Sequence, residues 1–216
     1  MKKSYFMLTL LAGVSVLATS VQAQDKGLYV GLKTSMFFSP SSQNNLEIEG
    51  LGILHQKFKT GFALNAAVGY DWGKYLRSEF ELGYKFQGAK NLNLLGASAE
   101  TNGTVRQFTL MPNLYVDIPL SDNFEFFVGG GLGLSIIGAK NYHLEGQDPK
   151  IIKGKNSAFA YQFMTGVSYG LTTNVDLTFE YRYYQTVPAK VKNDAGTKIK
   201  ADFNAHQIGF GIRYTF

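Results

Sequence analysis

The chain alternates apolar and small polar residues along eight separate segments. The clearest is 76–84, which reads LRSEFELGY, and the others are 28–38, 62–70, 108–117, 126–135, 161–169, 175–183 and 206–216. A period of two residues is typical of β-strands with two unlike faces. No segment shows the 3.6-residue period of a helix, and none has the roughly 18 uninterrupted apolar residues of a transmembrane helix. The pattern therefore predicts an all-β protein.

The two faces of these segments differ in charge. One face carries no Asp, Glu, Lys or Arg in any segment, whereas the other is rich in glycine and carries five charges of each sign. These charges are Lys33, Arg77, Glu79, Glu81, Lys85, Asp117, Asp176, Glu180, Arg182 and Arg213. An Arg or Lys facing lipid at mid-bilayer costs about 2–4 kcal/mol, so the uncharged face is the one suited to lipid.

The connections between the segments alternate in length. Residues 71–74, 119–123 and 172–174 are short turns, whereas 39–57, 87–104, 139–157 and 185–202 are long and polar. This layout predicts an eight-stranded antiparallel up-and-down transmembrane β-barrel with both termini in the periplasm and four extracellular loops. Closure satisfies the edge hydrogen bonds that a bilayer cannot. Pro112 lacks an N–H, so we expect a bulge or a missing ladder bond there.

The lumen of so small a barrel is just wide enough to be filled by side chains. Because buried charges must be paired, the balanced signs predict an internal salt-bridge network. A narrow or gated pore lined by the same residues is the alternative.

The first residues match a secretory signal. A basic start, Met1-Lys2-Lys3, precedes an uncharged stretch from Tyr5 to Val21, and Val21-Gln22-Ala23 resembles a cleavage site. We expect 1–23 to be a cleaved signal peptide and 24–216 to be the barrel. An uncleaved membrane anchor is the alternative.

Composition excludes several classes of function. The chain has 21 Lys and Arg against 16 Asp and Glu, and losing two lysines with the signal lowers the net charge from +5 to +3. These charges are interspersed, so nucleic acid is not an expected partner. There is no cysteine, which excludes disulfides and cysteine-based metal or catalytic sites. The histidines His55, His143 and His206 have no i, i+4 spacing, so we expect no metal and no cofactor.

Four stretches resemble a known class. They are the entry strand 27–31, the hairpin 69–84, the glycine-rich run 128–134 and the ending 208–216. Together they resemble the small bacterial outer-membrane barrels, namely the OmpA transmembrane domain and the opacity and surface-antigen porin-like families. The resemblance implies a monomer in the bacterial outer membrane, in contact with its lipids and lipopolysaccharide. It also implies that Tyr214 and Phe216 form the signal read by the barrel-insertion machinery.

The resemblance leaves the function open. Some small barrels modify lipid A with a His, a Ser and an acidic residue, but none of the three histidines here lies in a His-x-Ser pattern. We therefore expect no catalytic residue and favour a structural or adhesin-like surface role. A narrow porin-like channel, a lipid A-modifying enzyme and a soluble periplasmic barrel with its apolar face inward remain alternatives.

The long connections supply candidate contacts. The loops 139–157 and 185–202 together carry eight lysines against four acidic residues. Such a basic surface suits lipopolysaccharide phosphates or an anionic ligand on a host surface. The candidate ligand contacts are Lys150, Lys153, Lys155, Lys190, Lys192, Lys198 and Lys200. Ordinary solvated loop surface is the alternative interpretation.

Overall fold

The computed structural model describes residues 27–39, 45–48, 52–73, 75–94, 97–144, 152–187, 189–192, 198–201 and 203–216. Side chains are described outside 40–58, 89–103, 139–156 and 188–202. The described residues form twelve strands of one antiparallel sheet. None of them belongs to a helix long and apolar enough to cross a membrane. The predicted signal peptide lies outside the described residues.

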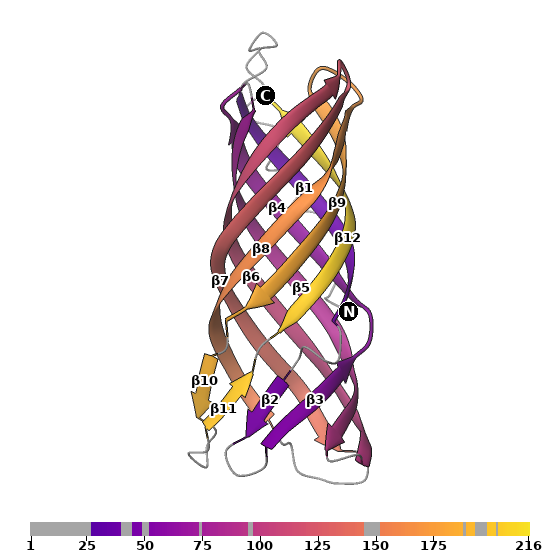
Figure 1. Cartoon of the computed structure of the whole chain (residues 1–216), viewed down its shortest axis with the longest axis vertical. Coiled ribbons are helices and arrows are strands. Elements are labelled where there is room, and N and C mark those ends of the chain that lie inside the picture. Colours follow the sequence, from indigo (N-terminus) through magenta and orange to yellow (C-terminus); the bar gives the residue numbers. More distant parts are fainter. Residues whose placement is uncertain are drawn as a thin grey trace, which may run out of the picture.

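Eight strands close into a barrel (Figure 1). They are β1 (Gly27–Phe38), β4 (Gly61–Asp71), β5 (Leu76–Leu94), β6 (Ala97–Ser121), β7 (Phe124–Leu144), β8 (Ile152–Gly170), β9 (Val175–Thr186) and β12 (Asn204–Thr215). Each pairs with its neighbours, and the ladder between β1 and β12 closes the ring. The predicted fold class is therefore confirmed.

The barrel wall separates two surfaces of opposite character. On the outside, Leu132 is 58% exposed and Phe210 is 65% exposed, and most other large apolar side chains of the strands are exposed in the same way. On the inside, Lys85 is 1% exposed and Arg182 is 2% exposed. The molecule is thus polar within and apolar without, which suits a wall surrounded by hydrocarbon.

Tight turns join the strands at the end of the barrel where the C-terminus lies (Figure 1). Gly73 adopts a φ of 73°, a conformation that favours glycine, and its N–H donates to Asp71 Oδ1 at 2.7 Å. The Leu171 N–H donates to the Val175 carbonyl at 2.8 Å in the turn between β8 and β9. The final residue, Phe216, donates its N–H to the Leu28 carbonyl at 3.0 Å. The short turns are where the sequence predicts them.

Pro112 interrupts one ladder without disturbing its register. The pairing of β6 with β7 runs through Leu110 with Leu134 and resumes at Asn113 with Gly131, so Met111 and Pro112 have no paired residue on β7. On the other side, Pro112 pairs with Phe80 of β5. Of the two outcomes expected at this proline, the structure has the missing bond.

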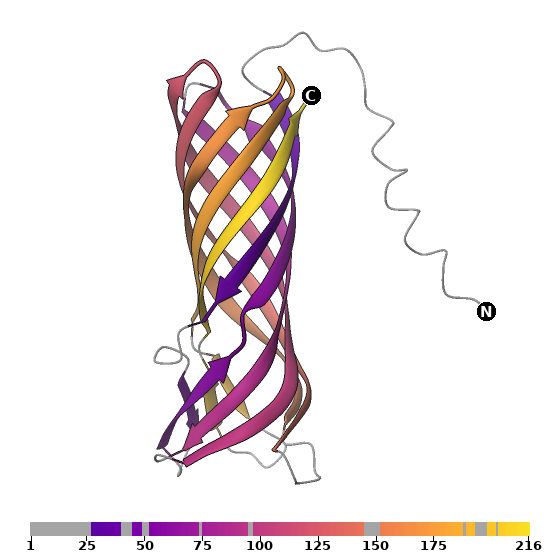
Figure 2. The same cartoon turned by 90° about the vertical axis from the view of Figure 1, so that its right-hand side faces the viewer.

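The opposite end of the barrel corrects one expectation. Much of the chain expected to form long loops consists of strands (Figure 2). β5, β6, β7 and β8 continue past the ends of the other four barrel strands. The strands β10 (Ala189–Lys192), β11 (Lys198–Ala201), β2 (Asn45–Ile48) and β3 (Gly52–Phe58) then pair in that order and join the end of β5. A second tier of the sheet therefore extends the wall.

The sequence pattern missed this tier for a physical reason. A strand outside the bilayer needs no lipid-facing apolar side, so its residues do not alternate as those of the barrel strands do. Its backbone groups still need partners, and antiparallel pairing supplies them.

Candidate functional site: the lumen and its loop-side mouth

The turn-side part of the lumen holds two arginine–carboxylate groups. Arg77 on β5 donates to both oxygens of Asp117 on β6, from Nε at 2.7 Å and from Nη2 at 2.9 Å. Arg213 on β12 donates from Nε to Asp176 on β9 at 2.8 Å and lies 3.4 Å from Glu125. Such charge-assisted bonds are the strong ones, and each here joins different strands.

The middle of the lumen holds a larger network around Glu81. Arg182 on β9 donates from Nη1 and Nη2 to the two oxygens of Glu81, at 2.5 and 2.8 Å. Lys33 on β1 lies 2.7 Å from Glu79 and 3.3 Å from Glu81. Arg182 also lies 2.7 Å from Glu180 on its own strand. The network links strands on different sides of the barrel, because β1 and β9 do not pair with β5.

Neutral side chains complete this network. The hydroxyls of Tyr29 and Tyr115 donate to Glu79 at 3.1 and 3.2 Å, and the Asn113 amide donates to the same carboxylate at 3.3 Å. The Gln162 amide bonds Asn113 Oδ1 at 2.8 Å. The buried carboxylates therefore have the several partners that burial of charge requires.

Large lumen side chains lie over glycines on the neighbouring strand. Tyr29 pairs with Gly69, Phe37 with Gly61, Tyr115 with Gly129, and Phe127 with Gly166. A Cβ added to any of these four glycines would lie closer to the facing ring than real atoms approach. The glycines of the charged face thus make room for aromatic rings, and the middle of the lumen is filled by side chains.

Lys85 stands apart from these ion pairs. It is buried on β5, and among the described residues its ammonium has no hydrogen-bond acceptor and no carboxylate within ion-pair distance. Its Nζ lies 3.3 Å from the ring centre of Tyr184, a cation–π contact. Gln107, the residue paired with Lys85, instead donates to the Tyr184 hydroxyl at 2.8 Å. The expected network therefore does not include Lys85.

An aromatic cluster lies beside Lys85 at the loop side. Phe203 precedes β12 and is anchored by Thr186, whose N–H donates to the Phe203 carbonyl at 2.8 Å and whose Oγ1 accepts its N–H at 2.9 Å. The Phe203 ring meets Phe37 edge-on at 6.3 Å and Tyr184 at 6.2 Å. Together with small side chains, these rings form a buried apolar cluster inside the barrel.

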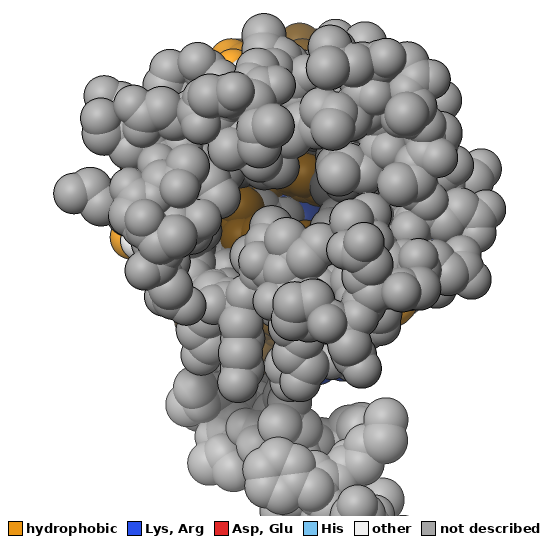
Figure 3. Space-filling model, turned by 90° about the horizontal axis from the view of Figure 1, so that it is seen from below, with side chains coloured by type: hydrophobic (Ala, Val, Ile, Leu, Met, Phe, Trp, Pro, Cys, Tyr) orange, Lys and Arg blue, Asp and Glu red, His pale blue; other side chains and the backbone are white. Residues whose placement is uncertain are grey.

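The loop-side face of the molecule is hollowed. Figure 3 shows an opening in this face, with hydrophobic side chains in its wall and a Lys or Arg side chain at depth. Side chains of the described part of the chain are therefore visible in this face.

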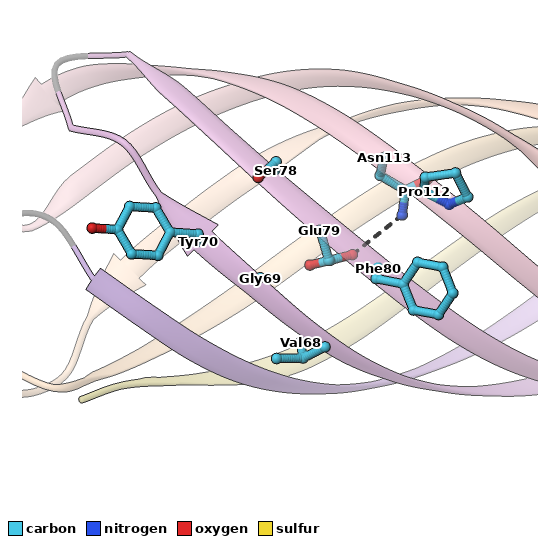
Figure 4. Close-up of a pocket in the computed structure, with 8 residues that line it drawn as sticks. All are labelled: Val68, Gly69, Tyr70, Ser78, Glu79, Phe80, Pro112 and Asn113. Atoms are coloured by element: carbon cyan, nitrogen blue, oxygen red, sulfur yellow. Dashed lines mark hydrogen bonds between the residues drawn. The ribbon is translucent and has the colours of Figure 1, made fainter.

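A second hollow lies in the outer wall (Figure 4). Val68, Tyr70, Phe80 and Pro112 line it with apolar surface. Glu79 and Asn113 form its floor, but they bond each other and the lumen network. This hollow opens toward the lipid side and its polar groups are already satisfied. The loop-side part of the lumen, where buried atoms of Lys85, Gln87 and Gln207 have no hydrogen-bond partner among the described residues, is therefore the better candidate site.

The remaining predicted site residues lie in several places. Lys153 and Lys155 belong to β8, Lys190 and Lys192 to β10, and Lys198 and Lys200 to β11, whereas Lys150 lies outside the described residues. Register pairs Lys190 with Lys200 and Lys192 with Lys198. At the turn side, the rings of Tyr214 and Phe216 meet at 5.1 Å.

The histidines are dispersed. His55 lies in β3 and His143 in β7, whereas His206 stacks on Phe38 and bonds the Tyr181 hydroxyl at 2.6 Å on the outer face. Within the described parts of the chain, no three His, Asp or Glu residues are placed to hold a metal ion.

Sequence reasoning missed the loop-side cluster. Phe37 and Tyr184 follow the alternation of the inward face, which is the signal that could have found them. Phe203 lies just beyond the stretch expected to form a loop, and no local pattern marks it as inward. The isolation of Lys85 also has no sequence signal, because it depends on which carboxylates other strands bring near.

Comparison with known proteins agrees with this architecture. The chain is 26% identical over 197 residues to an uncharacterized protein of Brucella abortus, covering 73% of this chain and 69% of that one. It is 22% identical over 170 residues to a candidate adhesin of Rickettsia prowazekii, covering 73% and 76%.

Two solved structures have the same fold. OprG, an outer membrane protein from Pseudomonas aeruginosa, matches with a TM-score of 0.59 at 14% identity, covering 91% of this chain and all of that one. Neisserial surface protein A matches with a TM-score of 0.54 at 19% identity, covering 89% of this chain. The family model for the outer membrane protein beta-barrel domain matches residues 6–216. The chain therefore belongs to the outer membrane protein beta-barrel family, and its place is the bacterial outer membrane.

Proposed function

We propose that this barrel is a non-enzymatic surface-interaction protein, adhesin-like in role, whose loop-side tier binds phosphate- or sulfate-bearing ligands through lysines. The observation that carries the proposal is the register of the β10–β11 hairpin, which pairs Lys190 with Lys200 and Lys192 with Lys198. Like charges directly opposite each other destabilise an antiparallel pair. Such an arrangement is relieved when an anion binds across it.

The position of the hairpin supports the same function. β11 also pairs with β2, where Glu47 lies opposite Lys200. Within the described strands β2, β10 and β11, one carboxylate therefore accompanies four lysines. The tier extends from a rigid barrel, and binding residues are usually held on such scaffolds. The Rickettsia relative, described as a candidate adhesin, is consistent with a surface role.

Replacing the four hairpin lysines with glutamine tests the proposal. We expect binding of the refolded protein to lipopolysaccharide and to heparin to weaken at least tenfold at physiological ionic strength. The remaining binding should lose most of its salt dependence, because the attraction being screened acts over a Debye length of about 8 Å. Binding is measured by surface plasmon resonance over a series of salt concentrations.

Two further variants make the result specific. The double variant Lys153→Gln, Lys155→Gln removes lysines from β8 and should weaken ligand binding less than the hairpin variant does. Lys59→Gln removes an exposed lysine outside the hairpin and should leave ligand binding unchanged. Heat-dependent migration in gels checks that each barrel is folded. A folded hairpin variant that binds both ligands as tightly as the parent would exclude this surface.

A further inference from the structure

Among the residues whose side chains the structure describes, the lumen contains one cation without a carboxylate partner, Lys85. Each described lumen carboxylate of the network already has a cation: Glu79 and Glu81 have Lys33, Glu180 has Arg182, and Asp117 has Arg77. Lys85 is as deeply buried as these groups, yet its ammonium has no hydrogen-bond acceptor among the described residues and lies over the face of the Tyr184 ring. A buried ammonium that lacks acceptors is costly, so such a group calls for an explanation by a ligand or by water.

Other donors on the same side of the lumen are also unmet. The amide nitrogens of Gln207 and Gln87 are buried without an acceptor, and Gln87 Oε1 is buried without a donor. Gln207 Oε1 accepts from the Ser35 hydroxyl at 3.3 Å. Gln207 pairs with Phe37 on β1 and with Arg182 on β9, and Arg182 is two residues from Tyr184. The unmet groups of this region thus include one ammonium and two amide N–H donors.

The surroundings of these donors are apolar and small. The buried cluster around Tyr184 contains the rings of Phe37 and Phe203 together with Ala63, Ala160 and Ala205. Ala63 pairs directly with Lys85, and Ala205 pairs directly with Tyr184. Figure 3 shows hydrophobic side chains and a Lys or Arg side chain within a hollow of the loop-side face.

We propose that the loop-side lumen binds a small organic monocarboxylate. Its carboxylate takes the donors of Lys85 and Gln207, and its apolar part lies among Phe37, Tyr184 and Phe203. This site is separate from the lysines of the β10–β11 hairpin and does not depend on them.

The chemistry of the site favours this ligand class over others. One ammonium and neutral amides match a single negative charge. A phosphate or a dicarboxylate would bring a second negative charge for which no further unpaired cation is described in this region. Aromatic rings around the donors favour an anion with an apolar body over a strongly hydrated one. A neutral apolar molecule would leave the Lys85 ammonium unmet.

Calorimetric titration of the refolded full-length protein with benzoate tests the proposal. We expect saturable binding to the parent, and Lys85→Met should weaken it at least tenfold, which corresponds to about 1.4 kcal/mol. Lys59→Met is the matched control, because it removes an exposed lysine at the loop side. This control should bind benzoate as the parent does.

Further ligands and a second variant separate the two parts of the site. Benzamide, which has the same ring without the charge, should bind at least tenfold more weakly than benzoate. Phe203→Ala should weaken benzoate more than acetate, because acetate has little apolar surface to lose. Absence of benzoate binding to the parent, equal binding to the Lys85→Met variant, or equal binding of benzamide would each overturn the proposal and leave ordered water as the partner of Lys85.

Discussion

The turn-side and loop-side parts of the lumen differ in whether their buried cations contact carboxylates. On the turn side and in the middle, Arg77, Arg182 and Arg213 each contact a carboxylate within 3 Å. On the loop side, Lys85 has a ring instead of a carboxylate, and buried amide atoms of Gln87 and Gln207 have no partner. The two regions lie on the same strands and have the same alternation, so the pattern of inward residues does not distinguish them.

Paired and unpaired buried groups have different consequences for stability and for ligand binding. A fully paired network links strands across the barrel, and removing one member leaves an opposite charge buried alone. A site whose hydrogen-bond donors have no acceptor contributes less to stability, but those donors can bond to a ligand. We therefore expect the paired region to contribute most of the stability of the lumen, and the proposed ligand site lies in the unpaired region.

Glu81→Gln should have the largest effect of the substitutions that compare the two regions. It removes the charge that meets both Arg182 and Lys33, so the free energy of unfolding should fall by about 3–5 kcal/mol. The measurement is urea unfolding of the protein in lipid vesicles. Glu125→Gln is the control, because Glu125 is partly exposed and meets Arg213 only at 3.4 Å. If both variants lost the same free energy of unfolding, the network around Glu81 would contribute no more to stability than a partly exposed ion pair does.

Gly129→Val should have the next largest effect on stability. The added side chain meets the ring of Tyr115, and forced repacking of a filled interior costs about 1–3 kcal/mol. Gly138→Val on the same strand is the matched control, since a Cβ there meets nothing closer than 4.0 Å. Equal unfolding midpoints for these two variants would show that the turn-side lumen is not tightly packed.

Lys85→Met should have the smallest effect on stability and is the sharpest test of the comparison. It removes a buried cation that has no carboxylate, so the free energy of unfolding should stay within about 1 kcal/mol of the parent or rise. The same urea titration measures it. A loss comparable to that of Glu81→Gln would place Lys85 in the structural network after all.

The sequence predicted the barrel because a bilayer imposes a strict rule on every spanning strand. Each segment must place apolar residues outward, so the period of two is visible in the sequence from Leu28 to Phe216. The short turns were predictable for a related reason, since residues such as Asp71 and Gly73 have local turn chemistry. Beyond the bilayer the rule no longer applies, and the strands β2, β3, β10 and β11 left no such pattern.

The charge balance of the lumen was also visible in the sequence, but the pairing was not. Alternation places Glu81, Lys85 and Arg182 inside, and five charges of each sign permit pairing. Which cation meets which carboxylate depends on strand register and on the reach of each side chain across the lumen, so Arg182 meets Glu81 although 101 positions separate them. The sequence by itself determined that the protein is a lipid-facing barrel with a charged interior. Only the tertiary structure decided that Lys85 lies over the Tyr184 ring without a carboxylate and that Phe37, Tyr184 and Phe203 cluster on the loop side of the lumen, because contacts between distant strands exist only once the barrel has closed.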